Sequence, residues 1–239
     1  MTLFGKNAAK EALKNNDLAI SKVYLLDGGD SKEIIALCKA RKASFTFVKS
    51  DALKRLANND KHQGIVVQAT EFVYANVDKV IEDLRQRDEK TFFMITSEIA
   101  DTHNLGAIIR SADFAGVNCV IVSKNNSASI NETVFKTSAG AAFNLPIVLA
   151  SNIAQMVEKL KKQNIFVYGL EVGGKDYLDI DYTGDIAIIV GGEDAGIKPL
   201  VKKLCDEVVQ INNAGKVSSL NASVASAVVL FEAKRQRQV

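Results

Sequence analysis

The sequence is poor in the residues that form metal sites and disulfide frameworks. Its 239 residues include only three cysteines and two histidines. The cysteines stand at unrelated positions in apolar surroundings, which is typical of small buried hydrophobic residues and not of paired thiols. His62 and His103 are far apart, and neither lies in a cluster with the spacing of zinc ligands. The sequence therefore predicts neither a disulfide framework nor a bound metal.

Long apolar runs are also missing. No stretch approaches the roughly 18 to 20 apolar residues that are needed to cross a bilayer. Residues 1–6 lack the long apolar core of a signal peptide. An apolar content of 47% is nevertheless ample for a packed core. We therefore expect a folded cytoplasmic protein that has no membrane partner.

A strong overall charge is absent as well, because the net charge is only +2. Its distribution is uneven. Residues 1–70 contain twelve Lys and Arg against seven Asp and Glu, a balance of +5, whereas residues 71–239 contain eighteen against twenty-one, a balance of −3. A basic N-terminal third suits contact with a polyanion, but exposed lysines on solvated helices give the same count. Both interpretations stay open on charge alone.

Residues 1–70 alternate between helical and strand patterns, which predicts a small α/β domain. Its expected elements are helices at 5–15, 31–42 and 50–57 and strands at 23–26, 45–48 and 64–69. The sequence becomes polar after residue 70, so we expect a linker at 71–76. A second domain is then expected at 77–239, beginning with a helix at about 77–87.

The second domain contains short apolar runs without the strict alternation of half-exposed strands. Such runs favour strands that are buried on both faces, and hence an α/β fold with a mainly parallel sheet flanked by helices. In these folds ligands bind at the loops beyond the carboxyl ends of the strands. The expected strands are 92–96, 119–123, 165–170, 186–190 and 208–211, and the loops are 97–104, 124–129, 171–175, 191–197 and 212–219.

Two of these loops are richer in polar residues and glycine than a connection requires. Asn104 stands at an expected helix start, with Arg110 about two turns further along. Each also has an ordinary explanation, Asn104 as a helix cap and Arg110 as a solvent-facing residue. Glycines follow the strand at 186–190 directly and let the backbone approach a ligand. A single glycine-rich turn is weak evidence, and this one is not a dinucleotide-binding signature.

The third loop precedes a helical pattern with a thin, alanine-rich side, which suggests that something packs closely there. Ser218 or Ser219 as the N-cap explains one polar residue. Asn221 is then expected inside the first helical turn, without a capping role. The alternative is that these side chains point toward a ligand.

The order and spacing of the loops carry more information than any loop alone. The segments are DTHNLGAIIR at 101–110, GGEDAG at 191–196, SSLNASVA at 218–225 and LFEAKRQR at 230–237. Together they closely resemble the three motifs of SpoU-type RNA ribose 2′-O-methyltransferases, the TrmH family of the SPOUT superfamily. FGKNAAKEAL at 4–13 and HQG at 62–64 also look like that family's substrate-binding domain. The resemblance thus covers nearly the whole chain.

The sequence departs from the family pattern at two places. The family usually has Ile-Pro-Met where this chain has Ile211-Asn212-Asn213, and Asp-Pro where it has Asp101-Thr102. The first departure lies beside the expected methyl-donor pocket, so it bears on donor affinity.

The resemblance implies a C-terminal trefoil knot, although true knots are nearly absent from proteins. It also implies a small N-terminal domain like ribosomal protein L30e, S-adenosylmethionine as methyl donor without a metal, and a homodimer. The expected substrate is a guanosine ribose of 23S rRNA, free or in a pre-ribosomal particle. A tRNA ribose remains the alternative substrate.

The resemblance also implies roles for individual residues. The expected catalytic residues are Arg110, Asn104, Glu193, Ser219 and Asn221. The expected donor-binding residues are Gly191, Gly192, Gly196, Ile211, Leu220 and Asn221. For RNA binding, the positive charge of the N-terminal domain points to Lys39, Arg41, Lys42, Lys54, Arg55 and Lys61.

Two other classes of function stay open. A catalytically inactive RNA-binding or ribosome-assembly protein would share the N-terminal charge, but it would not need the polar set of the motifs. A nucleotide-dependent α/β enzyme would share the glycines, although the dinucleotide and P-loop signatures are missing.

Overall fold

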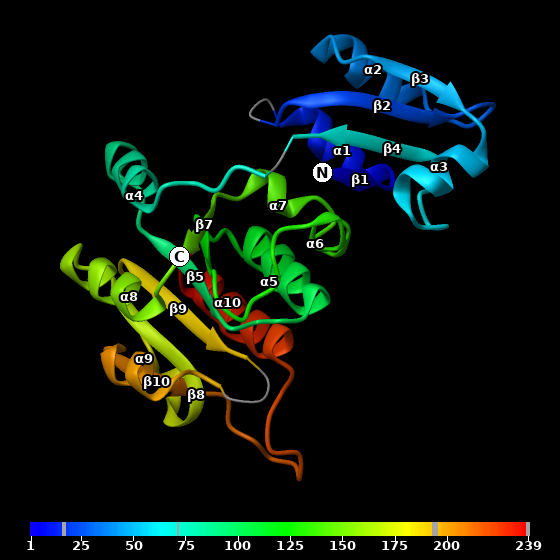
Figure 1. Ribbon diagram of the computed structural model, residues 1–239. Coiled ribbons are helices and arrows are strands. Elements are labelled where there is room, and N and C mark those ends of the chain that lie inside the picture. The colour runs from blue at the N-terminus through cyan, green and yellow to red at the C-terminus, as the bar shows by residue number, and fades with distance from the viewer. Residues whose placement is uncertain (16–17, 71, 193–195, 238–239) are drawn as a thin grey trace. The chain divides into compact units, whose positions relative to one another are not determined.

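The computed structural model of the chain describes residues 1–15, 18–70, 72–192 and 196–237. They divide into two compact units (Figure 1). The first unit comprises Met1–Val73 together with Ile130–Asn144, and the second comprises Tyr74–Ser129 together with Leu145–Val239.

The first unit is built on a four-stranded mixed sheet with the strand order β1-β4-β2-β3. Strands β2 and β3 are parallel, whereas β4 runs antiparallel to both β1 and β2. The predicted helices and strands are present, and β1 is an additional strand that the sequence pattern did not reveal. The elements are β1 (Thr2–Phe4), α1 (Lys6–Lys14), β2 (Ile20–Leu26), α2 (Lys32–Arg41), β3 (Phe45–Val48), α3 (Ser50–Ala57) and β4 (Ile65–Ala69).

Two short helices from later in the chain complete this unit. They are α6 (Glu132–Thr137) and α7 (Ala141–Asn144). The stacked rings of Phe135 and Phe143 are 4.1 Å apart, and the side-chain amide of Asn15 donates a 2.8 Å hydrogen bond to the carbonyl of Phe143. The division at residue 77 expected from the sequence placed this segment in the second domain. The structure places it with the first unit, because its apolar side packs on α1 and β1.

The second unit is built on a six-stranded sheet with the order β10-β8-β9-β5-β6-β7, and every adjacent pair is parallel. This confirms the predicted α/β fold with a parallel sheet. The strands are β5 (Phe92–Ser97), β6 (Cys119–Ser123), β7 (Ile147–Ala150), β8 (Phe166–Asp176), β9 (Ile186–Gly191) and β10 (Glu207–Gln210), and the helices are α4 (Val77–Gln86), α5 (Thr102–Ala115), α8 (Ile153–Lys162), η1 (Tyr177–Asp179), α9 (Pro199–Leu204) and α10 (Ala222–Arg237). The sequence did not predict strand β7, because a run of four apolar residues is too short to distinguish from the helical pattern on either side of it.

Helices cover the sheet of the second unit. Apolar residues of α4, α8 and α9 share one core cluster with the strands. Helix α10 packs against α5 and contributes Val229, Leu230 and Ala233 to the core. In the part of the chain that is described, no helix combines the length and the apolar character of a membrane span. The trefoil knot and the likeness of the first unit to ribosomal protein L30e stay predictions.

The arrangement of β5, β8 and β9 positions the site. Strand β9 lies between β8 and β5, although β5 comes long before the other two in the chain. Because parallel strands end at the same edge, the loops that follow these three strands meet there. The loop after β10 reaches the same edge, since β10 pairs with β8 in parallel.

Candidate active site

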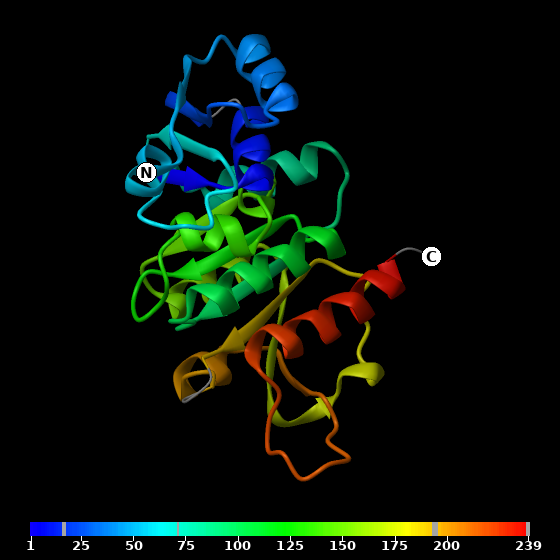
Figure 2. The same cartoon turned by 90° about the vertical axis from the view of Figure 1, so that its right-hand side faces the viewer.

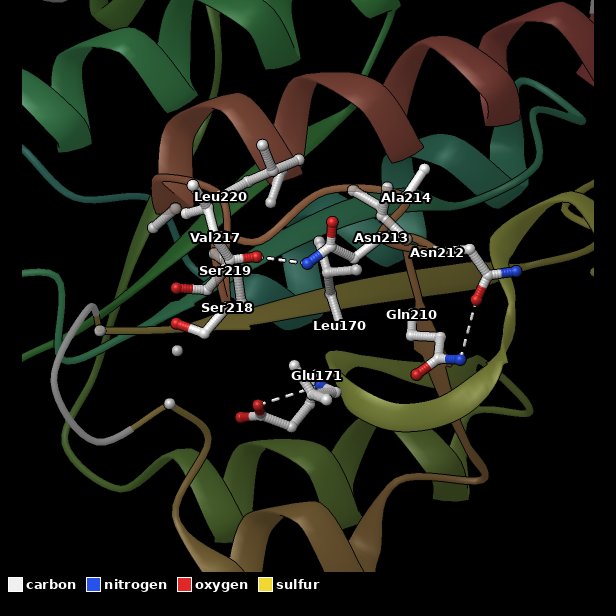
Figure 3. A pocket seen from close by; sticks show the side chains of 18 residues that line it. Leu170, Glu171, Gln210, Asn212, Asn213, Ala214, Val217, Ser218, Ser219 and Leu220 are labelled. Carbon is white, nitrogen blue, oxygen red and sulfur yellow. Dashed lines mark hydrogen bonds between the residues drawn. The ribbon is translucent and has the colours of Figure 1, made fainter.

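A cavity of about 590 Å³ lies in the second unit at the carboxyl edge of the sheet (Figure 3). Its walls come from β8, from the end of β9 and from the long loop between β10 and α10, which Figure 2 shows extending away from the sheet. Three of the loops expected from the sequence to carry a ligand thus contribute to one pocket. The lining residues are Leu170, Glu171, Val172, Val190, Gly191, Gly192, Gly196, Gln210, Ile211, Asn212, Asn213, Ala214, Val217, Ser218, Ser219, Leu220, Ala222 and Ala225.

The predicted glycines form one wall of the pocket as bare backbone. A Cβ on Gly191 would lie 2.0 Å from the carbonyl carbon of Gly196, and one on Gly192 would lie 2.6 Å from the carbonyl oxygen of Glu98. Gly196 has a φ of 59° and its N–H donates a 2.9 Å hydrogen bond to the carbonyl of Gly192. A side chain at Gly191 or Gly192 is therefore excluded sterically, so that only backbone atoms of these residues line the pocket.

The loop between β10 and α10 forms the opposite wall. Ile211, Ser219 and Leu220, which the resemblance assigns to the site, all line the pocket. Residues 212–221 are exposed throughout, and even Val217 keeps 74% of its surface open to solvent. The thin side of α10 enters the pocket through Ala222 and Ala225, in agreement with the close approach expected there.

Asn221 caps helix α10, which corrects the expectation that it lies inside the first turn without a capping role. Its Oδ1 accepts hydrogen bonds from the backbone N–H of Ser223 at 2.9 Å and of Val224 at 3.4 Å. The helix begins at Ala222, later than a cap at Ser218 or Ser219 requires. Asparagine is among the best N-cap residues, because its short side chain reaches these free N–H groups.

The same side chain joins two of the predicted motifs. The Nδ2 of Asn221 donates a 3.1 Å hydrogen bond to the Oδ1 of Asn104 on α5. Asn104 is not the cap of α5, since the carboxylate of Asp101 accepts the hydrogen bond from the N–H of Asn104 at 2.7 Å. Asp101 therefore caps α5, and the Asn104 side chain meets Asn221.

Arg110 lies on α5 with an exposed side chain. It has no hydrogen bond or ion pair to any other residue in the described ranges. An arginine of this kind has five N–H donors available for a partner outside the chain. Glu193, the remaining predicted catalytic residue, lies outside the described residues.

Several polar residues of the pocket were not assigned from the sequence. Gln210 bridges two elements, because its Oε1 accepts from the N–H of Gly173 at 2.8 Å and its Nε2 donates to Oδ1 of Asn212 at 2.9 Å. Asn212 in turn donates to the carboxylate of Asp176 at the end of β8. At the position where the sequence departs from the family pattern, Asn212 thus connects the loop to β8 through this hydrogen bond.

The N-terminal basic residues differ in how far they are engaged within the chain. The guanidinium of Arg41 donates to the carbonyls of Ala12 and Leu18, and burial lowers the pKa of Arg41. Lys54 pairs with Asp60 at 2.7 Å. The remaining predicted RNA-binding residues, all exposed, are Lys39, Lys42, Arg55 and Lys61. Among the described residues, no cluster of His, Cys, Asp and Glu is suited to hold a metal ion.

Comparison with known proteins establishes the family. The family described as SpoU rRNA Methylase matches residues 91–231, which include the pocket. The chain belongs to this family. Residues 2–75 match a second family, described as RNA 2′-O ribose methyltransferase substrate binding. The SpoU assignment confirms the resemblance drawn from the motifs.

Relatives within the SpoU family match over nearly their whole length. The 23S rRNA (guanosine-2′-O-)-methyltransferase RlmB of Pectobacterium atrosepticum is 35% identical, and the match covers 98% of each chain. RlmB of Escherichia coli is 34% identical over 98% of each chain. The SpoU methyltransferase AviRb from Streptomyces viridochromogenes, solved in complex with AdoMet, has a TM-score of 0.84 over all of this chain and 90% of its own. Because AviRb is only 24% identical, it shows that the SpoU fold is shared.

Proposed function

We propose that this protein transfers a methyl group from S-adenosylmethionine to a ribose 2′-hydroxyl of RNA, with a guanosine of 23S rRNA as the substrate. The observation that carries the proposal is the glycine-walled pocket, which lies within the region matched to the SpoU methylase family. The substrate follows from the RlmB relatives, which are similar over the whole chain and are named for this nucleoside.

The pocket residues fit the methyl donor. A cavity of 590 Å³ lies within the roughly 300 to 1,000 Å³ that is typical of small-molecule sites. Leu170, Val190 and Leu220 offer apolar surface for an adenine ring, and backbone groups at Gly192, Ile211 and Leu220 are the proposed hydrogen-bonding partners of the donor. At Gly192 the absence of a side chain admits close approach. Gly191, Gly196 and Asn221 complete the proposed donor site.

When bound, the donor supplies an electrophilic methyl group on a sulfonium sulfur. The protein has to align the ribose hydroxyl and stabilise the charge that develops on its oxygen as the proton leaves. Arg110 is the group proposed for this role, since its guanidinium is exposed and unengaged among the described residues. Arg110 could act in two ways: it could accept the proton of the ribose hydroxyl with help from an RNA phosphate, or it could stabilise the developing negative charge electrostatically. Because arginine normally stays protonated, we give the electrostatic role at least equal weight.

Asn104, Ser219, Asn221 and Glu193 are the proposed positioning residues. Asn221 holds Asn104 through the 3.1 Å hydrogen bond, and so links the helix that carries Arg110 to the helix that borders the pocket. Ser219 lines the pocket directly. Glu193 is proposed to act with them.

We further propose that the first unit binds RNA and that the second unit holds the donor. The substrate-binding match over residues 2–75 and the basic excess of residues 1–70 support this division. The exposed residues Lys39, Lys42, Arg55 and Lys61 are the proposed phosphate contacts, with Lys54 as a further one. Arg41 is a poorer candidate, because its guanidinium is used within the chain.

A homodimer is proposed on the basis of apolar surface on α5 and α10. Phe114 is 70% exposed and Phe231 is 42% exposed, and their ring centroids lie 5.9 Å apart. Val224 extends the exposed surface along α10. A partner at this surface would bring a second chain close to Arg110. The cytoplasm, where ribosomal RNA is modified, is the proposed location.

Two experiments test the proposal. Mapping of 2′-O-methyl groups in 23S rRNA from a deletion strain should show one guanosine that has lost its methyl group, and plasmid-borne protein should restore it. A tRNA site lost in place of the rRNA site would favour the alternative substrate. Calorimetric titration should detect S-adenosylmethionine but not NAD or ATP, whereas binding of none of them would favour a non-catalytic assembly protein.

A further inference from the structure

Strand β8 contains an excursion that places one carboxylate inside the pocket. Val208 of β10 pairs with Gly169, but the next residue, Val209, pairs with Lys175. Residues 170–174 therefore leave the pairing with β10. The excursion ends at Gly174, where a Cβ would lie only 2.2 Å from the carbonyl oxygen of Val208. Glu171 lies in this excursion and lines the pocket (Figure 3).

The carboxylate of Glu171 is held by two backbone donors. Its Oε2 accepts a 3.0 Å hydrogen bond from the N–H of Ile197, and its Oε1 accepts one of 3.0 Å from the N–H of Val172. A Cβ on Gly196 would lie 2.2 Å from Oε2, so glycine at that position makes room for the carboxylate. The group is therefore oriented before any ligand arrives.

Its charge is not neutralised within the described part of the chain, where no Lys, Arg or His forms an ion pair with Glu171. Each carboxylate oxygen has two lone pairs, and each accepts one N–H. Among the residues that the structure describes, none occupies the second acceptor position of either oxygen. A half-buried carboxylate of this kind is suited to a ligand with two adjacent hydrogen-bond donors.

We propose that Glu171 binds the 2′- and 3′-hydroxyls of the ribose of S-adenosylmethionine. A vicinal diol presents two donors side by side, which matches the two remaining acceptors of a planar carboxylate. Acidic residues bind ribose hydroxyls in other parallel α/β folds for the same reason. This inference rests on the proposed function, since it names the donor group that this pocket recognises.

The substitution Glu171→Gln tests the proposal, because the amide keeps the side-chain size but replaces one acceptor oxygen with an NH₂ donor. We expect the affinities for S-adenosylhomocysteine and for 5′-methylthioadenosine to fall by roughly tenfold each, as for other hydrogen bonds to a charged group. Both ligands contain the diol, but only S-adenosylhomocysteine contains an amino-acid group. Isothermal titration calorimetry measures both affinities without RNA or turnover.

A matched analogue isolates the hydroxyl. The 2′-deoxy analogue of 5′-methylthioadenosine should bind the unsubstituted protein more weakly than its parent, and Glu171→Gln should weaken it much less than the parent. The control Glu158→Gln removes the same charge from an exposed position on α8 and should leave all affinities unchanged. The deoxy comparison on unsubstituted protein tests the inference even if Glu171→Gln does not fold.

Three results would overturn the inference. Weaker binding of S-adenosylhomocysteine alone would mean that Glu171 faces the ammonium group. If Glu171→Gln left the affinity for both ligands unchanged but lowered the unfolding temperature, Glu171 would only stabilise the fold by joining β8 to Ile197. If the unsubstituted protein bound neither ligand, the proposed methyl donor itself would be wrong. This outcome differs from a wrong role for Glu171, because the control variant Glu158→Gln would then also fail to bind.

Discussion

The side-chain amide of Asn221 donates a 3.1 Å hydrogen bond to the side-chain oxygen of Asn104, although 117 positions separate the two residues. The Oδ1 of Asn221 is meanwhile occupied by the first N–H groups of α10. One side chain thus caps one helix and positions a residue on another. The two functions use different atoms, so substitutions can separate them.

We expect Asn221→Asp to preserve the fold but impair catalysis. Aspartate caps helices as well as asparagine does, so the free energy of unfolding should change by less than about 0.5 kcal/mol. A carboxylate cannot donate to the Oδ1 of Asn104, so the Asn104 amide has to turn and donate to the carboxylate instead. This reversed Asn104 side chain should lower kcat ten- to a hundredfold, on the order expected for a misoriented positioning group. Chemical denaturation and single-turnover methylation measure the two effects.

Asn221→Ala is the matched comparison, because it removes both the cap and the donor. It should cost about 1 kcal/mol of stability in addition to the loss of activity. Full activity in Asn221→Asp would show that the hydrogen bond to Asn104 has no catalytic use.

Arg110→Ala should abolish methyl transfer while S-adenosylmethionine still binds. In the proposed role, the Arg110 guanidinium acts on the ribose oxygen and not on the donor. The affinity for the donor, measured by calorimetry, should therefore change by no more than about twofold, whereas the loss of a contact worth about 1.4 kcal/mol would change it tenfold. Lys79→Ala removes a charge from an exposed position on α4 and should leave turnover unchanged. Near-normal turnover in Arg110→Ala would contradict the mechanism.

The chain should sediment as a dimer of twice 25.9 kDa, and Phe114→Asp should dissociate it. A charge placed in an apolar interface loses its hydration without gaining a partner, which weakens association. The Phe114 side chain is largely exposed in the single chain, so the variant should still fold. A fully active species of 25.9 kDa at micromolar concentration would refute the dimer.

Combined replacement of Lys39, Lys42, Arg55 and Lys61 by alanine should weaken RNA binding and flatten its salt dependence. Each lost phosphate contact should reduce the slope of log K against log salt by roughly 0.7 to 0.9, because fewer counterions are released. Substitution is preferable to deletion of residues 1–70, since deletion would uncover the apolar side of Ile130–Asn144. Donor affinity should not change, and unaltered RNA affinity at matched salt would contradict the proposed division between the units.

Tyr182→Phe should leave stability unchanged or raise it by up to about 1 kcal/mol, because removing a hydroxyl without a hydrogen bond relieves its desolvation cost. The Tyr182 hydroxyl is fully buried and has no hydrogen-bond partner among the described residues, and burial raises the pKa of Tyr182 far above its ordinary value. Tyr168→Phe is the control. Its hydroxyl donates a 2.9 Å hydrogen bond to the carbonyl of Asp181, so its loss should cost about 1 kcal/mol. Destabilisation of Tyr182→Phe by more than the control would reveal a partner for its hydroxyl.

The sequence by itself determined the class of the fold and the loops that form the pocket. Strands such as β5 and β9 are buried along their whole length, so their apolar runs are continuous and easily recognised. Gly191 and Gly192 directly follow a buried strand in the sequence, which indicated a loop where the backbone comes close to a ligand, and the structure leaves no room for a side chain at either position. The motif spacing then indicated the family, which the comparisons confirm.

Only the tertiary structure decided what depends on partners that are distant in the chain. The start of α10 was misplaced because serine and asparagine cap helices about equally well, and local preference could not choose among Ser218, Ser219 and Asn221. Glu171 was missed because the excursion of β8 follows from its register with β10, which the residues of β8 alone do not specify. The packing of Ile130–Asn144 on α1 and β1 was missed for the same reason: an apolar helix face shows that something covers it, but not which element does.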